Sequence, residues 1–229
     1  MSNGLSKEEG TERIAGSASN WGGFKEVWCI VAPSAKAGTA VTPAVGLLRA
    51  FLNSREIAEG TDKLASLDGL RDWMASLGLV GSEHGLVPGD GEWVCAVREA
   101  LRDVLAAHNG AEVPAESLTV LNRVAARTLF VATFNESGTL AMTAVERGAP
   151  GAIGRIWSAV MTSQMEGTWP RLKACRRDDC RWIFLDQSKN HSGTWCTSEG
   201  CGALMKARAY RRRRAAATDP SASPRARAD

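Results

Sequence analysis

The sequence predicts a mainly α-helical protein with one small β-hairpin and a compact cysteine-rich module near its C-terminal end. Three observations favour this fold class. Apolar residues recur at helical spacing in several segments before residue 166, two runs of β-forming residues flank a turn sequence, and four cysteines form two Cys-x4-Cys pairs. With 229 residues, 44% of them hydrophobic, the chain can bury one sizeable core beside a small appended module.

The N-terminal region has the weakest pattern. Residues 1–20 are polar and rich in Gly and Ser, so we expect them to be disordered. Residues 27–32 fit a short strand, and residues 33–43 have the Gly, Ala and Pro content of a loop. Residues 43–58 have apolar positions at roughly helical spacing, which predicts a helix, although a strand over residues 47–52 is an alternative.

Three clearer helices come next. Residues 64–77 place their apolar side chains on one face, and Gly78 stops the pattern. Residues 91–108 predict a long amphipathic helix, and residues 114–127 predict a shorter one that begins at a proline. Each presents an apolar face that a shared core would bury.

A β-hairpin is predicted after these helices. Residues 129–134 and 140–145 are rich in β-forming residues, and residues 135–138 between them have turn chemistry. Residues 148–151 contain two glycines and a proline, which indicates a break in regular structure.

The last helix of this region is predicted over residues 153–161, and Gly167 and Pro170 close it and mark a linker. After residue 214 the sequence is a low-complexity run of Ala, Ser, Pro and Arg that cannot bury enough apolar surface to fold. We therefore expect a disordered N-terminus (1–20), a helical domain (21–168), a cysteine-rich module with a basic helix (171–214) and a disordered tail (215–229).

The C-terminal module contains two cysteine pairs separated by fifteen residues, Cys175 with Cys180 and Cys196 with Cys201. Two such knuckles bring four thiolates to one tetrahedral Zn²⁺, and four sulfurs close its coordination shell, so the predicted zinc is structural and not catalytic. Disulfides are the alternative for six cysteines, but no secretion signal is visible. We expect the two lone cysteines, Cys29 and Cys95, to be buried hydrophobes.

Small zinc modules have little core, so the metal supplies much of their folding free energy. Residues 182–185 form the apolar strip between the cysteine pairs, and we expect a strand there that packs over the metal. Polar turn residues follow that can hydrogen-bond backbone or sulfur. His191 is an alternative ligand, although four sulfurs already complete the shell. The supporting residues expected around the metal are Phe184, Asp186, Ser188, Asn190 and Trp195.

Charge is distributed unevenly, although the formal net charge is only +3. Residues 171–214 contain twelve Lys or Arg against four acids, whereas residues 1–170 are net acidic. A basic module on an acidic body is typical of a protein in which one part binds a polyanion. The alternative is a solvated helix whose arginines only complement the helix dipole. The candidate nucleic-acid contacts are Lys206, Arg208, Arg211, Arg212, Arg213 and Arg214.

Several of these features occur together in a known family. They are the two cysteine pairs, the aromatic Phe184, an Asp-x-Ser-x-Asn turn at residues 186–190, a Trp195-Cys196 pair, and Cys201-Gly202 leading into a basic helix. In these features residues 175–214 resemble the CGNR zinc-finger family. The resemblance implies a treble-clef or ribbon-like module with one structural zinc.

Two features depart from the CGNR pattern. The Asn-Arg that follows Cys-Gly in the family is Ala203-Leu204 here, and Gly193-Thr194 replaces the basic residues that usually precede Trp-Cys. Neither change removes a zinc ligand. Together they remove cationic groups that could have contacted phosphate or base edges, so the expectation of nucleic-acid binding rests mainly on residues 206–214.

The preceding region is similar to the ABATE domain, the alanine-rich and mostly helical partner of the CGNR finger, described as a candidate stress-induced transcription regulator in bacteria. The similar residues are 52–55 (Leu-Asn-Ser-Arg), 73–79 and the helix over 98–105, and the resemblance does not reach residues 1–45. It implies a regulator that binds DNA through its zinc module, with the helical domain sensing a small ligand or a protein partner.

Two other classes of function are weighed against a regulator. The first is a zinc-stapled protein-interaction or ligand-sensing protein without DNA contact. The second is an enzyme, but the sequence shows no nucleophile with a base, no phosphate-binding Gly loop and no open metal site, so we expect no catalytic residues. No apolar run reaches the roughly 18 residues of a membrane helix. We therefore expect a cytoplasmic protein, with a homodimer as one compatible state.

Overall fold

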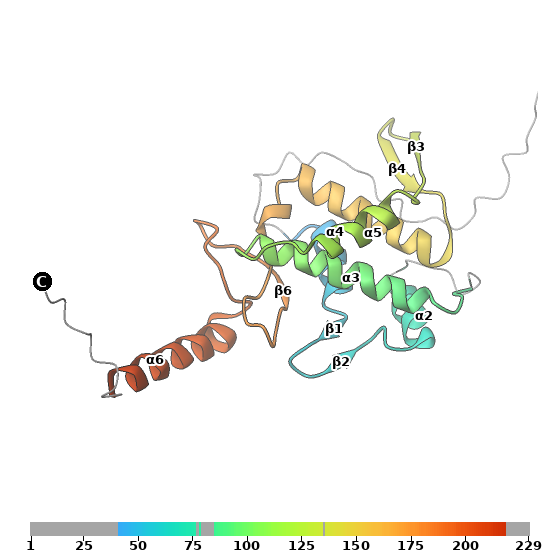
Figure 1. The fold of residues 1–229 in the computed structure, drawn as a ribbon. Coiled ribbons are helices and arrows are strands. Elements are labelled where there is room, and N and C mark those ends of the chain that lie inside the picture. Colours follow the sequence, from blue (N-terminus) through green and yellow to red (C-terminus); the bar gives the residue numbers. More distant parts are fainter. Residues whose placement is uncertain (1–40, 77, 79–84, 135, 219–229) are drawn as a thin grey trace, which may run out of the picture.

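The structure is a computed structural model that describes residues 41–76, 78, 85–134 and 136–218. The expectations for residues 1–20 and 27–32, for Cys29 and for residues 219–229 fall outside this part of the chain. Within it the protein is mainly helical with small two-stranded sheets, which confirms the predicted fold class (Figure 1). No described helix is both long enough and apolar enough to cross a membrane.

Helix α3 is the central element of the described fold, because it packs against α1, α2, α4, α5 and β5. The helices are α1 (Pro43–Leu52), α2 (Leu67–Ser76), α3 (Asp90–Ala107), α4 (Ala115–Ala125), α5 (Gly148–Met165) and α6 (Ala203–Thr218). Three antiparallel pairs are formed by β1 (Arg55–Glu56) with β2 (Thr61–Asp62), β3 (Phe130–Phe134) with β4 (Leu140–Ala144), and β5 (Leu172–Ala174) with β6 (Ile183–Leu185). A 3₁₀ turn at Trp169–Arg171 precedes β5, and a π-helical turn at Ser198–Gly202 precedes α6.

The apolar stripe of α3 explains its central place. Val94, Val97, Leu101 and Leu105 recur at spacings of three and four residues, which puts them on one face of the helix, and all four are buried. Neighbouring helices bury their own stripes against this face. The predicted hairpin forms as β3 and β4, in the register Phe130 with Ala144.

Helix α1 is shorter than the predicted helix over residues 43–58, because it ends at Leu52 and the chain turns into the β1–β2 hairpin. Arg98 of α3, which is only 1% exposed, holds this hairpin. Its guanidinium donates to both carboxylate oxygens of Asp62 at 2.7 Å and to the hydroxyl of Ser54 at 3.1 Å. A tertiary contact therefore ends α1, and the local apolar period does not reveal it.

The break predicted at residues 148–151 is wrong, since α5 begins at Gly148 and runs through the glycines. A Cβ atom at Gly151 would collide with the carbonyl of Glu146, and one at Gly154 would collide with the side chain of Ala144 in β4. These glycines serve close packing of the first turns of α5 against β4 and the chain that follows it, and they do not interrupt the helix.

Strands β5 and β6 of the C-terminal module lie in the same core as the helices. Alternate side chains of the two strands are buried among those of α1, α3 and α5. The strand residues in this core are Leu172, Ala174, Ile183 and Leu185. The described residues of the two predicted domains are thus joined by continuous apolar packing across the predicted linker.

Side chains of the helical part also hydrogen-bond the backbone of the β6 strand. The amide of Asn53 donates to the carbonyl of Ile183 at 2.9 Å and accepts from its N–H at 2.8 Å, so one side chain satisfies both backbone groups of that residue. Arg102, which is completely buried, donates to the carbonyl of Arg181 at 2.8 Å and to the carbonyl of Leu52. These contacts fix β6 to the end of α1.

The C-terminal end of α3 holds β5 in a similar way. The amide of Asn109 donates to the carbonyls of Ala174 and Thr194, both at 2.9 Å. Ring nitrogen Nδ1 of His108 lies 2.8 Å from the carbonyl of Leu172. Two adjacent residues therefore position the strand that leads directly into the first cysteine.

We predict that Asn53→Ala lowers the free energy of unfolding by about 2 kcal/mol, because it leaves the N–H and the carbonyl of Ile183 without partners. Urea unfolding measures this loss. The matched control is Asn122→Ala on the exposed face of α4, which should change stability by less than about 0.5 kcal/mol. Equal stability of the two variants would contradict the proposed role of Asn53.

Candidate metal centre

The four cysteine sulfurs of the module lie in one cluster. All four Sγ atoms are within 4.8 Å of one another, with 3.8 Å between Cys180 and Cys196 and 3.6 Å between Cys196 and Cys201. Tetrahedral coordination with Zn–S bonds of about 2.3 Å places sulfurs about 3.8 Å apart. The donor set therefore fits one Zn²⁺ with a closed shell of four sulfurs.

Two tight turns present the sulfurs. In the first, the N–H groups of Cys180 and Arg181 donate to the carbonyl of Arg177 at 2.9 and 3.0 Å, and Arg181 adopts a left-handed φ of 50°. In the second, the hydroxyl of Thr197 accepts from the N–H of Gly200 at 3.2 Å and so caps the π-helical turn. Each cysteine pair thus spans a turn whose backbone is already hydrogen-bonded.

The apolar surroundings affect how the thiols ionise. Burial raises the pKa of Cys180 to about 11 and also raises the pKa of Cys196, and the hydrogen bond between Cys196 and Cys201 adds to the latter. Burial acts in the same direction on Cys201, but hydrogen bonds from the neighbouring thiols lower its pKa below the usual value. Without metal Cys180 and Cys196 keep their protons at neutral pH, so zinc binding releases protons from them.

Asp186, expected to hydrogen-bond backbone or sulfur near the metal, organises the loop that leads to Trp195. Its carboxylate accepts from the N–H groups of Ser188 and Gly193 at 2.9 Å and pairs with the ammonium of Lys173 at 2.7 Å. Burial opposes ionisation of Asp186, yet these hydrogen bonds hold its pKa far below the usual range. Because the folded-state pKa is low, the pair stabilises the fold at neutral pH, and this contribution is lost as the pH falls below about 4.

Lys173 and Gly193 are supporting residues that the sequence analysis missed. Lys173 is 4% exposed and also donates to the carbonyls of His191 and Gly193 at 2.6 and 3.2 Å. A Cβ atom at Gly193 would lie 2.5 Å from a carboxylate oxygen of Asp186, so only glycine fits there. The replacement of a basic residue by Gly193 therefore has a packing reason. A lysine between two apolar strand residues, Leu172 and Ala174, was the available signal.

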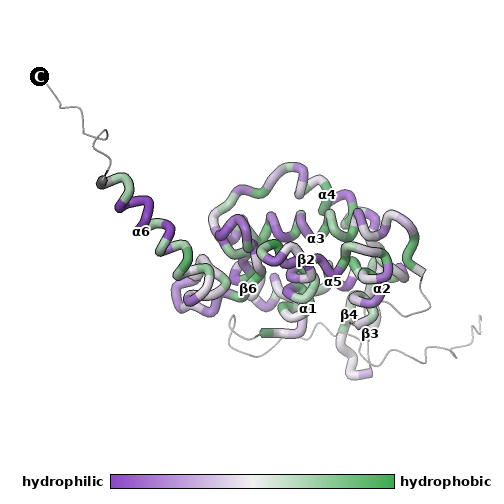
Figure 2. Tube along the Cα trace, turned by 90° about the horizontal axis from the view of Figure 1, so that it is seen from below, coloured by the Kyte–Doolittle hydropathy of each residue, from purple (hydrophilic) through white to green (hydrophobic). Residues whose placement is uncertain are grey.

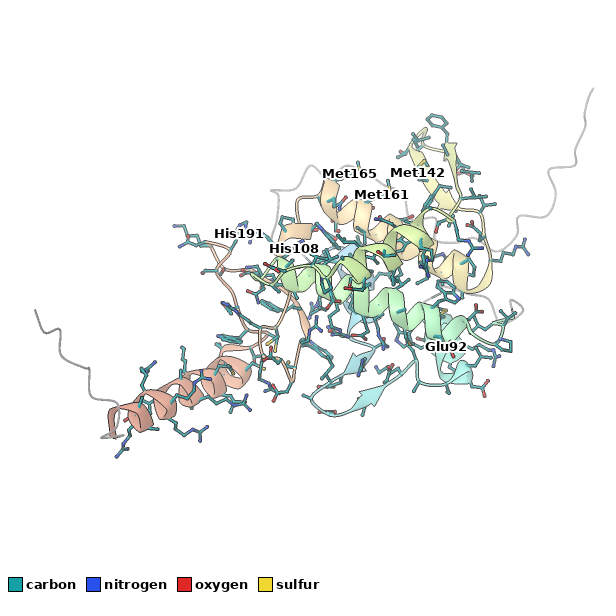
Figure 3. All side chains as sticks on the ribbon, viewed as in Figure 1. Glu92, His108, Met142, Met161, Met165 and His191 are labelled. Carbon is teal, nitrogen blue, oxygen red and sulfur yellow. The ribbon has the colours of Figure 1, made fainter. Side chains whose placement is uncertain are left out.

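The other residues expected to support the metal lie in β6, beside Gly202 and in the loop after β6. Phe184 is buried in β6, opposite Lys173 in the strand register. Trp195 packs on Gly202, since a Cβ atom there would lie 3.3 Å from the indole. The hydroxyl of Ser188 accepts from the N–H of Ser192 at 3.0 Å, and Asn190 is exposed in the same loop. The described metal-ligand cluster does not include His191, whose position in the loop is labelled in Figure 3.

Helix α6 follows the second cysteine turn and extends away from the rest of the protein (Figure 2). Hydrophilic and hydrophobic segments alternate along it, and Leu204 and Met205 in its first turn are half-buried. The tail predicted to be disordered from residue 215 is helical as far as Thr218, because three alanines, which are strong helix formers, continue α6. Arg208 lies 3.6 Å from Asp179, which also pairs with Arg177.

Comparison with protein families agrees with this architecture. Residues 46–163 match the ABATE family model, whose description is "Putative stress-induced transcription regulator". This match covers slightly more than half of the chain. The chain belongs to the ABATE family. Residues 171–214 match the CGNR zinc finger, so this ABATE protein carries a zinc finger whose four clustered cysteines can hold one zinc ion. None of the curated proteins compared with the chain matches it.

The ABATE match includes the residues that hold the zinc module. Asn53, Arg102 and Asn109 all lie within residues 46–163, and their backbone partners Ile183, Arg181 and Ala174 lie within the CGNR match. The resemblance at residues 52–55 therefore has a structural reason. In this ABATE protein the Leu-Asn-Ser-Arg segment forms part of the contact between the two matched regions.

We predict that the purified protein contains one zinc per chain and that Cys196→Ser abolishes it, as measured by elemental analysis. The same variant should also lower the free energy of unfolding by about 3 kcal/mol or more, because β5 and β6 share the helical core. Thermal unfolding of the whole chain, followed by its far-UV signal, should then show a midpoint roughly 10 °C lower. Cys95→Ser removes a thiol outside the cluster and should keep the zinc. Full zinc content in Cys196→Ser would contradict the assignment.

We predict that Lys173→Met lowers the free energy of unfolding by about 3–5 kcal/mol, because it leaves the buried carboxylate of Asp186 without its cation. Lys206→Met is the matched control, since it makes the same change at an exposed lysine of α6. It should leave the unfolding midpoint nearly unchanged. Similar urea midpoints for the two variants would show that the pair contributes little.

Proposed function

We propose that this ABATE protein is a bacterial, cytoplasmic transcription regulator that binds DNA through its CGNR zinc module. In this proposal residues 171–214 are the DNA-binding domain, residues 21–168 are the sensing domain, and Cys175, Cys180, Cys196 and Cys201 hold the structural zinc. The observation that carries the proposal is the placement of α6. It projects from the zinc module with exposed Lys206, Arg211, Arg212, Arg213 and Arg214.

The exposed cations of α6 have no apolar surface to cover. The helix has no strong apolar stripe beyond Met205, and side chains 206–208 and 210–216 are exposed. A helix with this composition in a folded protein is suited to a polyanion, because released counterions make the association favourable at low salt. The acidic sequence of the helical part disfavours contact with the same polyanion, which confines binding to the module.

The helical part offers a place for a small effector. A hollow of about 450 Å³ lies between the loop before α2 and the start of α3, lined by Leu64, Leu67, Pro88 and Cys95. This volume is in the range of about 300–1,000 Å³ that small-molecule sites occupy. Since α3 lines the hollow at one end and holds β5 and β6 at the other, it physically links an effector site to the zinc module.

The alternative function is a zinc-stapled interaction protein without DNA contact. The observation that favours it is an apolar surface around β3, β4 and α5, where Phe134 is 74% and Met165 is 66% exposed. Met142, Met161 and Met165 lie on this side of the molecule (Figure 3). Exposed apolar patches of this kind mark protein contacts, including a second copy of the chain. Neither family description names a catalytic activity, and we propose none.

We predict that the protein binds DNA with an affinity that falls steeply with salt, measured by fluorescence anisotropy on fragments of unrelated sequence. Replacing residues 211–214 by Ala should weaken binding to all fragments and reduce the salt slope by about one unit per lost phosphate contact. The matched control replaces the same four arginines by Lys, which keeps the charge and should retain most of the affinity.

The result that would contradict the proposal is the absence of salt-sensitive binding at low salt for the zinc-loaded protein. A protein partner that is retained after all four arginines are replaced by Ala would favour the alternative function instead. Zinc content and far-UV signal, measured on the same samples, show that the variants are folded.

A further inference from the structure

A groove separates the zinc knuckles from one face of α6. It has a volume of about 390 Å³. The residues that line it are Arg176 and Trp195 of the zinc module and Met205, Lys206, Ala209 and Arg212 of α6. The sequence analysis did not select Arg176, which follows the first cysteine and is exposed. The groove therefore combines residues that are far apart in the sequence.

The groove selects one face of α6. Residues 206, 209 and 212 follow Met205 by one, four and seven positions, so all four lie on the same side of the helix. Ala207 and Arg211 lie on the opposite side, and Arg208 lies beside Asp179. Only two of the six cations expected to contact nucleic acid, Lys206 and Arg212, thus face the groove.

The groove combines three cationic side chains with one aromatic ring. Arg176, Lys206 and Arg212 take part in no ion pair among the described residues, so their charges are available to an anion. Trp195 is half-buried, with part of its indole seated on Gly202 and part lining the groove. The small side chain of Ala209 leaves space on the helix side. Cations beside an aromatic ring suit a nucleic-acid strand, whose phosphates meet the charges while a base stacks on the ring.

We propose that this groove holds one unpaired nucleic-acid strand, with phosphates on Arg176, Lys206 and Arg212 and one base against Trp195. The proposal rests on the proposed function and deepens it, since it names the strand and the face that contact it. A base paired within a duplex is stacked between its neighbours and cannot lie on a side chain in a groove. The zinc-loaded protein therefore prefers a locally opened or single strand over a continuous duplex.

The decisive test compares Ala209→Glu with Ala207→Glu. Both variants add the same charge to the same helix, but only the first places a carboxylate in the groove. Binding is measured by anisotropy with a labelled single strand of about 16 nucleotides and with the duplex of the same sequence. We expect the unchanged protein to bind the single strand more tightly. Ala209→Glu should weaken that binding at least about tenfold more than Ala207→Glu does.

A second pair of variants keeps the test independent of folding at residue 209. Arg212→Ala should weaken single-strand binding more than Arg211→Ala, although both remove one cation from adjacent positions. Equal losses within both pairs would overturn the groove as the binding site. Tighter binding of the duplex would overturn the unpaired strand. In either case the proposed function would still stand if binding is salt-sensitive and is lost on replacing residues 211–214. If the protein binds neither probe, both the proposed function and the groove proposal are wrong.

Discussion

The hydrogen bonds from Asn53, Arg102 and Asn109 to the backbone of β5, of β6 and of the turn before β6 are the contacts on which the rest of the structure depends. Each side chain lies in the helical part, and each partner carbonyl or N–H lies beside a cysteine turn. A buried backbone group without a partner costs about 1–3 kcal/mol, so these side chains make a two-stranded hairpin stable inside a helical core. The hairpin in turn places Cys175 and Cys180 for the metal.

This arrangement divides the stabilisation between apolar burial and metal. A zinc module of this size has too little apolar surface to fold by burial alone. Here its two strands contribute four buried side chains to the core of α1, α3 and α5 and so share a larger apolar cluster. On the other side of the strands, the Lys173–Asp186 pair orders the loop that carries Trp195 and Cys196. We therefore expect loss of zinc to destabilise the helices as well as the module.

The two surfaces proposed for function lie toward opposite ends of α3. The hollow proposed for an effector lies at the N-terminal end of α3, and the contacts with β5 and the cysteine turns lie at its C-terminal end. Helix α6 leaves the module beyond these contacts and keeps its cations in solvent. The proposed sensing and binding regions are thus joined by helix α3, and the groove at Trp195 lies where the zinc module meets α6.

The sequence by itself determined the elements whose information is local. Apolar periods fixed α2 to α4 closely, β-forming runs around a turn fixed the β3–β4 hairpin, and cysteine spacing indicated a four-sulfur cluster. Zinc coordination needs only four thiolates at suitable spacing, which is why the cluster was visible without a structure.

Only the tertiary structure decided where α1 ends, why Gly151 and Gly193 are glycines, and which face of α6 meets Trp195. Each of these depends on a contact between side chains or backbone that no helical or strand period reveals: Arg98 holding Asp62, the atoms that face each glycine, and Arg176 with Arg212 along one groove. An apolar period shows which face of a helix or strand is buried, but it does not identify the segment that packs against that face. The joining of the two matched regions into one core was hidden for the same reason.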